Sequence, residues 1–167
     1  MAFNARDLAV NGVQALQPYL PGKPVEELER DLGLSDIVKL ASNENPRTSN
    51  EVIEKALAQQ QSDISRYPDG SGYALKIRLS DLLGVSTDQL TLGNGSNDVL
   101  ELLVRAFVCP GQGVVVSEHS FAVYSLAASA VGADLKTAPA RSWGHDLEAM
   151  LSLVDQNTRV VFIANPN

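Results

Sequence analysis

From about residue 89 onward, short apolar runs alternate with longer amphipathic segments, and this alternation restricts the chain to few architectures. The apolar runs are continuous, as is typical of strands that are covered on both faces. They are Gln89–Leu92, Val114–Val116, Leu135–Ala138 and Arg159–Ala164, and the predicted helices between them are Asn97–Phe107, Phe121–Val131 and Asp146–Leu153. Strands that alternate with helices predict an α/β fold with a mostly parallel sheet flanked by helices.

The first 88 residues carry a weaker pattern, which prolines interrupt at positions 18, 21, 24 and 46. Residues 25–30 predict a short helix with Pro24 near its start, and Ile37–Ala41 predicts a short strand. Two further helices are predicted, one from Asn50 to about Gln61 and one from Tyr73 to Leu83, where Gly84 ends it.

The composition is that of a globular protein, and it excludes several classes of function. Of the 167 residues 44% are hydrophobic, and the net charge of −7 disfavours binding to nucleic acid or to an acidic membrane surface. Cys109 is the only cysteine, which excludes an intramolecular disulfide and a cysteine metal cluster. With no apolar leader and no apolar run of about 20 residues, the sequence predicts a cytoplasmic protein, and the two histidines lack metal-ligand spacing.

The most informative local motif is Gly93-Asn-Gly-Ser-Asn-Asp98, which lies between a predicted strand and a predicted helix. Glycines let the backbone turn sharply, and the N–H groups and partial positive charge of a helix N-terminus suit a phosphate. Neither the Walker A loop nor the dinucleotide-binding glycine motif is present, because the required lysine and third glycine are missing. Two interpretations stay open: a phosphate-binding turn, or a tight turn in which Ser96 or Asn97 caps the helix.

Six segments, in the same order along the chain, resemble the histidinol-phosphate aminotransferases, a family of fold type I enzymes that use pyridoxal phosphate (PLP). They are Leu40-Ala-Ser-Asn-Glu-Asn-Pro46, Arg66-Tyr-Pro-Asp-Gly70, Gly93-Asn-Gly-Ser-Asn-Asp98, Phe121-Ala-Val-Tyr124, Trp143-Gly-His-Asp146 and Asn165-Pro-Asn167. The resemblance implies the N-terminal part of this fold. Residues 1–46 would form an N-terminal arm and small-domain segment, and residues 47–167 the first part of the large PLP-binding domain. The chain departs from the family at Arg47–Asn50, where a turn containing Gly-Pro is usual.

The resemblance also implies which residues would bind the cofactor. Gly95, Ser96 and Asn97 would bind the PLP phosphate, with the backbone N–H groups of Ser96 and Asn97 as donors. Phe121 would stack on the pyridine ring, where relatives often have tyrosine, because stacking needs a flat face and no hydroxyl. Asn165 would contact the 3′ oxygen and so tune the electronics of the cofactor. A plain core phenylalanine is the alternative for Phe121.

Three further residues receive roles from the resemblance alone. Tyr67 would reach the cofactor phosphate of the other subunit, and Tyr19 and Asn43 would lie near the substrate. An ordinary turn aromatic is the alternative for Tyr67. For His119 and His145, surface or capping roles are expected.

The implied activity is that of a homodimeric enzyme of histidine biosynthesis. It would transfer an amino group between histidinol phosphate and 2-oxoglutarate, giving imidazole-acetol phosphate and glutamate. The family's Schiff-base lysine lies beyond residue 167, as do the aspartate that pairs with the pyridinium nitrogen and the carboxylate-binding arginine. No catalytic residue is therefore assigned, and the 167-residue chain is expected to be an inactive N-terminal fragment. Another class I/II aminotransferase, such as an aromatic amino acid transaminase, and a stand-alone phosphate-binding α/β module are the alternatives.

Overall fold

The computed structural model describes residues 5–17, 22–40, 44–45 and 51–167, which divide into two compact units. The first unit joins Met1–Tyr19 with Thr91–Asn167, and the second is Leu20–Leu90. The boundary predicted between residues 46 and 47, with its assignment to a small and a large domain, stays a prediction.

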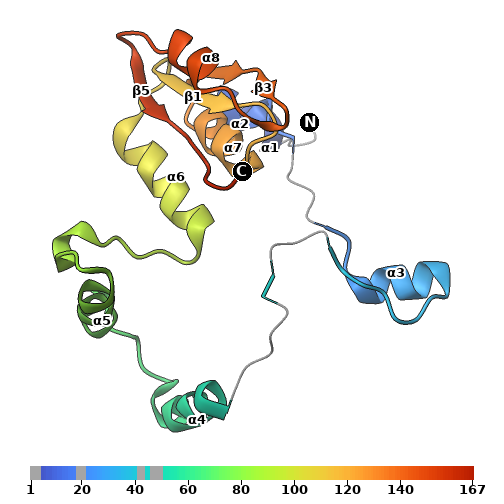
Figure 1. Ribbon diagram of the computed structural model, residues 1–167, viewed down its shortest axis with the longest axis vertical. Helices are drawn as coiled ribbons and strands as arrows, with labels where there is room; N and C mark the ends of the chain where they lie inside the picture. The colour runs from blue at the N-terminus through green and yellow to red at the C-terminus, as the bar shows by residue number, and fades with distance from the viewer. Residues whose placement is uncertain (1–4, 18–21, 41–43, 46–50) are drawn as a thin grey trace. The chain divides into compact units, whose positions relative to one another are not determined.

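The first unit contains all the strands of the described residues (Figure 1). Its helices are α1 (Ala5–Leu8), α2 (Asn11–Gln14), α6 (Ser96–Phe107), α7 (Ala122–Ala130) and α8 (Leu147–Ser152). Its strands are β1 (Gly113–Ser117), β2 (Asp134–Ala138), β3 (Ala140–Arg141), β4 (Gly144–His145) and β5 (Thr158–Val161). Among the described residues, no helix is both long enough and apolar enough to cross a membrane.

Three strands form a parallel sheet in the order β2-β1-β5. Val114 of β1 lies opposite Leu135 of β2 on one side and Val160 of β5 on the other. Every residue of β1 is buried, because the strand has a neighbour on both sides and helices on both faces. The sheet therefore has the buried, Val-rich central strand that the sequence pattern predicts for a parallel α/β fold.

Alternate residues of β1 point to opposite faces of the sheet, and each face has its own helices. Val114 and Val116 join α6 and α7 in one apolar cluster, which Phe162 completes beyond β5. Val115 faces the other way and packs with Met150 of α8. The result is a three-layer arrangement in which α6 and α7 cover one face and α8 covers the other (Figure 1).

Helix α2 packs on α7 by a close approach of the two backbones. A Cβ atom built on Gly12 would lie 2.0 Å from the carbonyl oxygen of Ser129 and 3.1 Å from the backbone nitrogen of Gly132. No other residue type fits at position 12 without moving α2, so this glycine permits the contact between the two helices.

Among its described residues, the second unit contains helices and no strand. They are α3 (Val25–Leu32), α4 (Glu51–Gln60), the 3₁₀ helix η1 (Gln61–Asp63), α5 (Tyr73–Leu83) and the 3₁₀ helix η2 (Thr87–Gln89). None of the residues of α3, α4 or α5 is buried, and the core clusters lie in the first unit. Gly84 ends α5 in a left-handed conformation with φ of 68°, as its sequence position predicts.

Most of the helices and strands predicted from the sequence are confirmed, usually within one or two residues. Two strands were predicted wrongly. Residues 37–40 form no strand, and residue 41 lies outside the described residues. Gln89 ends η2, which a capping box with Ser86 stabilises, and residues 90–92 are not a strand either. The sequence pattern also missed α1, α2 and the β3–β4 hairpin, all of which are shorter than a hydrophobic repeat can identify.

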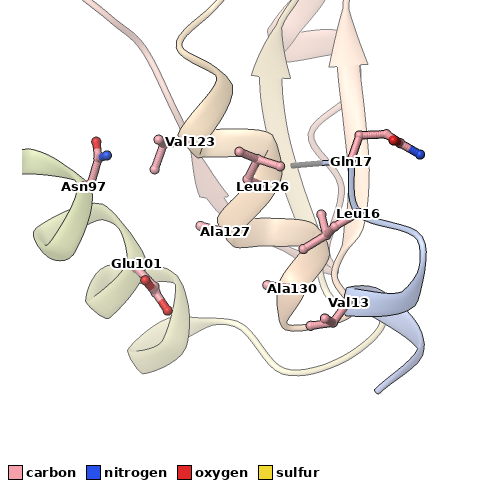
Figure 2. Close-up of a pocket in the computed structure, with 9 residues that line it drawn as sticks. All are labelled: Val13, Leu16, Gln17, Asn97, Glu101, Val123, Leu126, Ala127 and Ala130. Carbon is pink, nitrogen blue, oxygen red and sulfur yellow. The ribbon is translucent and has the colours of Figure 1, made fainter. Parts of the chain in front are cut away.

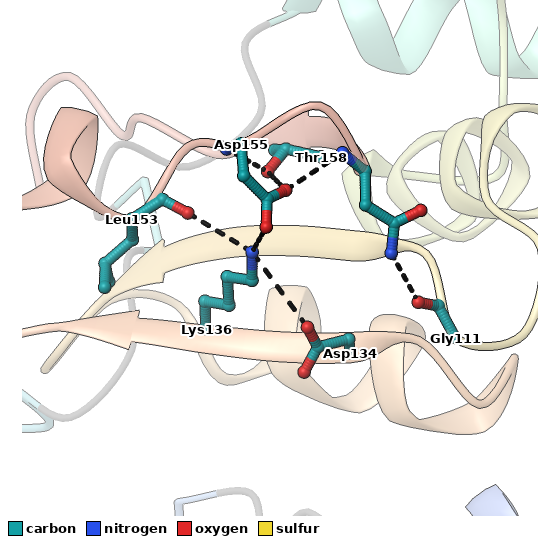
Figure 3. Close-up of polar contacts among 7 residues, drawn as sticks. Gly111, Asp134, Lys136, Leu153, Asp155 and Thr158 are labelled. Atoms are coloured by element: carbon teal, nitrogen blue, oxygen red, sulfur yellow. Dashed lines mark hydrogen bonds and ion pairs between the residues drawn. The ribbon is translucent and has the colours of Figure 1, made fainter.

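A cluster of polar contacts ties β2 to the turn that precedes β5 (Figure 3). The Lys136 ammonium lies 2.6 Å from a carboxylate oxygen of Asp155 and 3.3 Å from the carbonyl oxygen of Leu153. The Thr158 hydroxyl donates to the same carboxylate at 3.0 Å. These contacts, with the Lys136 hydrogen bond contributing most, lower the pKa of Asp155 to about 2.

The first prediction concerns this aspartate. Lys136→Met should raise the pKa of Asp155 towards its ordinary value, because the largest cause of the depression is removed. A carboxylate whose pKa is lowered in the folded state stabilises the fold above its unfolded pKa, about 4. That contribution is lost as the pH falls towards 2. The parent protein should therefore lose stability more steeply between pH 4 and pH 2 than Lys136→Met does.

The measurement is a carboxyl ¹³C NMR titration of Asp155, paired with urea unfolding at several pH values. An unchanged titration of Asp155 in Lys136→Met would contradict the ion pair.

Candidate functional site at the carboxyl edge of the sheet

The turn before α6 has a backbone that only glycine fits. Gly95 is the N-cap residue of α6, with φ of 84° and ψ of 173°, a combination that side chains other than hydrogen strongly disfavour. A Cβ atom on Gly93 would lie 2.6 Å from Cγ2 of Val99, so this position is also closed to side chains. The Asn94 N–H donates to the Asp98 carboxylate at 2.9 Å, which holds the turn against the first turn of the helix.

The N-terminus of α6 is left without a side-chain cap. Ser96 is the first residue of the helix, and no side-chain hydrogen bond caps it among the described residues. The alternative in which Ser96 or Asn97 acts as the N-cap residue is therefore wrong, because the structure gives that position to Gly95. An uncapped helix of 12 residues presents N–H groups and a partial positive charge at this end, which suits an anion.

Phe121 lies at the N-cap position of α7, directly after the loop that follows β1. Its ring meets that of Tyr124 edge-on, with centroids 5.8 Å apart, and Tyr124 in turn stacks on Phe162 at 4.4 Å. Phe162 belongs to the core, whereas Phe121 is 39% exposed. Phe121 is therefore a supported ring with accessible surface rather than a fully buried core residue.

Asn165 follows β5 and is exposed. The backbone N–H of the preceding residue, Ala164, donates to Nε2 of His145 at 2.9 Å. The side-chain amide of Asn167 lies 3.5 Å from the carbonyl oxygen of Trp143, and the Asn165–Pro166 peptide bond is cis. The segment after β5 is thus attached to the hairpin that contains Trp143 and His145.

The parallel sheet brings these groups to one place. Strands β1 and β5 are parallel neighbours, so the segments carrying Phe121 and Asn165 both leave the sheet at its carboxyl edge. Asn97 at the start of α6 and Val123 at the start of α7 line one cavity, which places both helix N-termini at that edge. In open α/β sheets, ligands bind in this position, beyond the carboxyl ends of the strands.

A cavity of about 550 Å³ lies beside this edge, between α2, α6 and α7 (Figure 2). Its walls are mostly apolar and include Leu16, Leu126 and Ala127. Of the residues implied by the resemblance, only Asn97 lines it. The Glu101 carboxylate accepts from Arg105 of the same helix at 2.6 Å. Because this cavity offers few polar groups that converge, the carboxyl edge is the better candidate site.

The structure does not test the roles predicted for the remaining residues that the sequence singled out. Tyr67 is fully exposed in the second unit, and its predicted role stays a prediction. Tyr19 and Asn43 lie outside the described residues. Among the residues that are described, no group of three potential ligands could hold a metal ion.

His145 was interpreted wrongly from the sequence as a surface or capping residue. It is half-buried, and the cap of α8 is Asp146, which accepts from the Ala149 N–H at 3.0 Å. No local signal could have shown its contact with Ala164, because the two residues are 19 positions apart. His119, by contrast, is exposed and packs its ring on Trp143 with centroids 4.7 Å apart.

Solved structures with the same arrangement of helices and strands define the class. Histidinol-phosphate aminotransferase from Sinorhizobium meliloti, crystallised in complex with pyridoxal-5′-phosphate, superposes with a TM-score of 0.78 at 26% identity. The match covers 92% of this chain and 41% of that one. Aspartate aminotransferase from Thermotoga maritima has the same fold, with a TM-score of 0.67 at 22% identity over 85% of this chain and 40% of that one. The fold is that of the fold type I transferases.

The sequence comparisons give the family. Residues 35–167 match the model of aminotransferase class I and II, and the chain belongs to this family. It is 56% identical to histidinol-phosphate aminotransferase 2 of Pseudomonas fluorescens (strain Pf0-1), covering 100% of this chain and 46% of the relative. It is 52% identical to histidinol-phosphate aminotransferase 2 of Nitrosospira multiformis, covering 99% and 43%. The chain spans less than half the length of these curated relatives.

The second prediction concerns the turn. Gly95→Ala should destabilise the protein by about 1–3 kcal/mol, because alanine must adopt a backbone conformation that its Cβ atom disfavours. The cause would be the dihedral angles and not a clash, since no residue other than the two chain neighbours lies within 4 Å of the added Cβ. Urea unfolding measures the change, and Ser96→Ala is the control. If Gly95→Ala proves as stable as Ser96→Ala, the turn does not require glycine at this position.

Proposed function

We propose that this chain supplies the cofactor-binding part of a PLP-dependent histidinol-phosphate aminotransferase. The observation that carries the proposal is the uncapped N-terminus of α6, which lies at the same sheet edge as an accessible aromatic ring and an exposed amide. The names of relatives that are 52–56% identical support the substrate. The reaction would convert histidinol phosphate and 2-oxoglutarate into imidazole-acetol phosphate and glutamate.

The residues of this edge fit the cofactor. Apart from its two chain neighbours, no residue lies within 4 Å of a Cβ atom built on Gly95, which is compatible with a phosphate bound in front of the turn. The N–H groups of Ser96 and Asn97 would donate to that phosphate, and the helix dipole would favour its negative charge. The ring of Phe121 would contact the flat face of the pyridine, and the Asn165 amide would donate to the 3′ oxygen.

These contacts would hold and orient the cofactor but would not move a proton. PLP, when bound, supplies an electron sink for the bonds around the substrate's amino carbon. Lys136 is not proposed as a proton carrier, because its ammonium is bound by the Asp155 carboxylate at 2.6 Å. The acid–base group of the reaction is therefore not assigned to any residue of this chain.

The proposed assembly is a homodimer in the cytoplasm, as in the family that the sequence resembles. The contact of Tyr67 with the cofactor of another subunit is proposed on the ground of the resemblance, and the complete exposure of its side chain is compatible with that contact. Tyr19 and Asn43 are proposed to lie near the substrate on the ground of the resemblance alone.

The third prediction tests the phosphate contact. Ser96→Pro removes one backbone N–H at the first position of α6, where proline is tolerated. The ψ of 173° at Gly95 is close to the ψ that a residue before proline prefers, and glycine tolerates its φ of 84°. PLP affinity should fall about tenfold to a hundredfold, the effect of one hydrogen bond to a charged group.

The measurement is a PLP titration followed by visible absorbance. Ser96→Ala is the matched control, because it keeps the N–H and should bind PLP like the parent. Equal affinities for Ser96→Pro and Ser96→Ala would place the phosphate elsewhere.

The fourth prediction tests the activity. The protein that contains this chain together with the family's C-terminal half should form glutamate from histidinol phosphate and 2-oxoglutarate. Its kcat/KM should be at least about tenfold higher than with phenylalanine or tyrosine as donor, because a buried polar site discriminates strongly against ligands that leave it unpaired. Residues 1–167 alone should form glutamate no faster than free PLP does.

Donor competition assays under identical conditions give this ratio. A preference for the aromatic donors would replace the proposed substrate with an aromatic amino acid. Turnover by residues 1–167 alone would place the acid–base group within this chain.

A further inference from the structure

The β3–β4 hairpin contacts both loops that carry the candidate ligand-binding residues. Its two strands pair through Ala140 with His145 and Arg141 with Gly144. Ser142 and Trp143 form its tip in the left-handed conformation, with φ of 52° and 66°. Because non-glycine residues adopt this conformation at a cost, contacts elsewhere must hold the hairpin in place.

On one side the hairpin is bonded to the loop between β1 and α7. The Ala140 N–H donates to Oε2 of Glu118 at 3.0 Å, and the Glu118 N–H donates to the carbonyl oxygen of Ala138 at 2.8 Å. The rings of His119 and Trp143 pack together at 4.7 Å. This loop leads directly into Phe121.

On the other side the hairpin is bonded to the segment after β5. The last backbone hydrogen bond between β5 and β1 is that of the Phe162 N–H with the carbonyl oxygen of Val115, at 2.9 Å. Two residues later, the Ala164 N–H donates to Nε2 of His145. That bond is the tether nearest to Asn165, and the contact of Asn167 with Trp143, at 3.5 Å, is longer.

The His145 bond fixes the chemical state of the imidazole. A ring nitrogen that accepts a hydrogen bond from an amide carries no proton, so the neutral ring carries its proton on Nδ1. Nδ1 is buried and has no hydrogen-bond partner among the described residues. A buried donor without a partner lowers stability, so a residue at this position needs a compensating role.

We infer that His145 is a positioning residue: through the Ala164 N–H it fixes the start of the segment that presents Asn165 to the cofactor. The identity of the cofactor in this inference rests on the proposed function. The hydrogen bond from the Ala164 N–H to His145 does not depend on that function. Glu118, His119 and Arg141 are the charged or titratable groups on the loop and hairpin around His145, and Asp146, the N-cap residue of α8, follows it directly. Of these, Glu118 and Asp146 are already occupied by the N–H groups of Ala140 and Ala149.

The test compares two substitutions of His145, to phenylalanine and to glutamine, with the substitution of His119 to phenylalanine. His145→Phe keeps a ring but removes the acceptor, whereas His145→Gln keeps an acceptor oxygen. His119→Phe is the matched control, because it keeps the ring contact with Trp143 and has no bond to Ala164. Amide hydrogen exchange of Ala164 is measured without cofactor, with Val115 of β1 as the reference for the fold.

Exchange at Ala164 should become about threefold to tenfold faster in His145→Phe, the effect of losing one hydrogen bond. It should stay within about twofold of the parent in His145→Gln and His119→Phe, and Val115 should be unchanged in all three. Long-range ¹H–¹⁵N spectra of the parent should show Nε2 as the unprotonated nitrogen, a result that needs no variant. The opposite tautomer, or equal exchange in His145→Phe and His119→Phe, would overturn the tether.

PLP titration then links the tether to the site. The affinity should fall about threefold to tenfold in His145→Phe and recover in His145→Gln. If the amide of Ala164 exchanges faster in His145→Phe while the PLP affinity equals that of the parent, the positioning role is overturned. If the parent itself does not bind PLP, the proposed function fails, and the exchange data still decide whether His145 holds Ala164.

Discussion

The parallel pairing of β1 with both of its neighbours is the constraint on which the site depends. Because β2 and β5 run in the same direction as β1, the chain must leave all three strands at one edge of the sheet. The apolar side chains of β1 alternate between two faces, and burying both faces against helices fixes the register. A slip of one residue would turn Val115 towards α6 and α7, and would separate the loops that lead to Phe121 and Asn165.

The turn before α6 uses the same edge in a different way. Gly95 supplies a backbone conformation instead of a side chain, so the N-terminus of α6 is free of a side-chain cap. A cap typically stabilises a helix by about 1 kcal/mol, and a bound anion can replace that contribution. The hairpin with His145 then adds the contact that orients the segment after β5. Stability is given up locally at these positions, while the fully buried strand β1 maintains the fold.

Periodicity predicted the elements that bury a face, and short-range chemistry predicted where several of them end. The apolar run of β1 and the stripe of α6 are visible in the sequence, and Gly84 marks the end of α5. Residues 90–92 are apolar enough to suggest a strand, but η2 and its capping box take the place of sheet pairing there. The role of His145 could not be predicted, because its partner is brought near only by the tertiary fold. The phosphate-binding turn was one of two local interpretations and stays a prediction, whereas the side-chain cap is excluded because the structure places Gly95 at the N-cap position.

The central claim is that the N-terminus of α6 binds the phosphate of PLP. Amide ¹H–¹⁵N spectra of the labelled protein, recorded while PLP is added, test it most directly. The account predicts downfield shifts for the N–H groups of Ser96 and Asn97, with Val104 in the middle of the same helix as an unshifted reference. Inorganic phosphate should produce the same pattern at higher concentration. Saturation with PLP that leaves Ser96 and Asn97 unshifted would contradict the account.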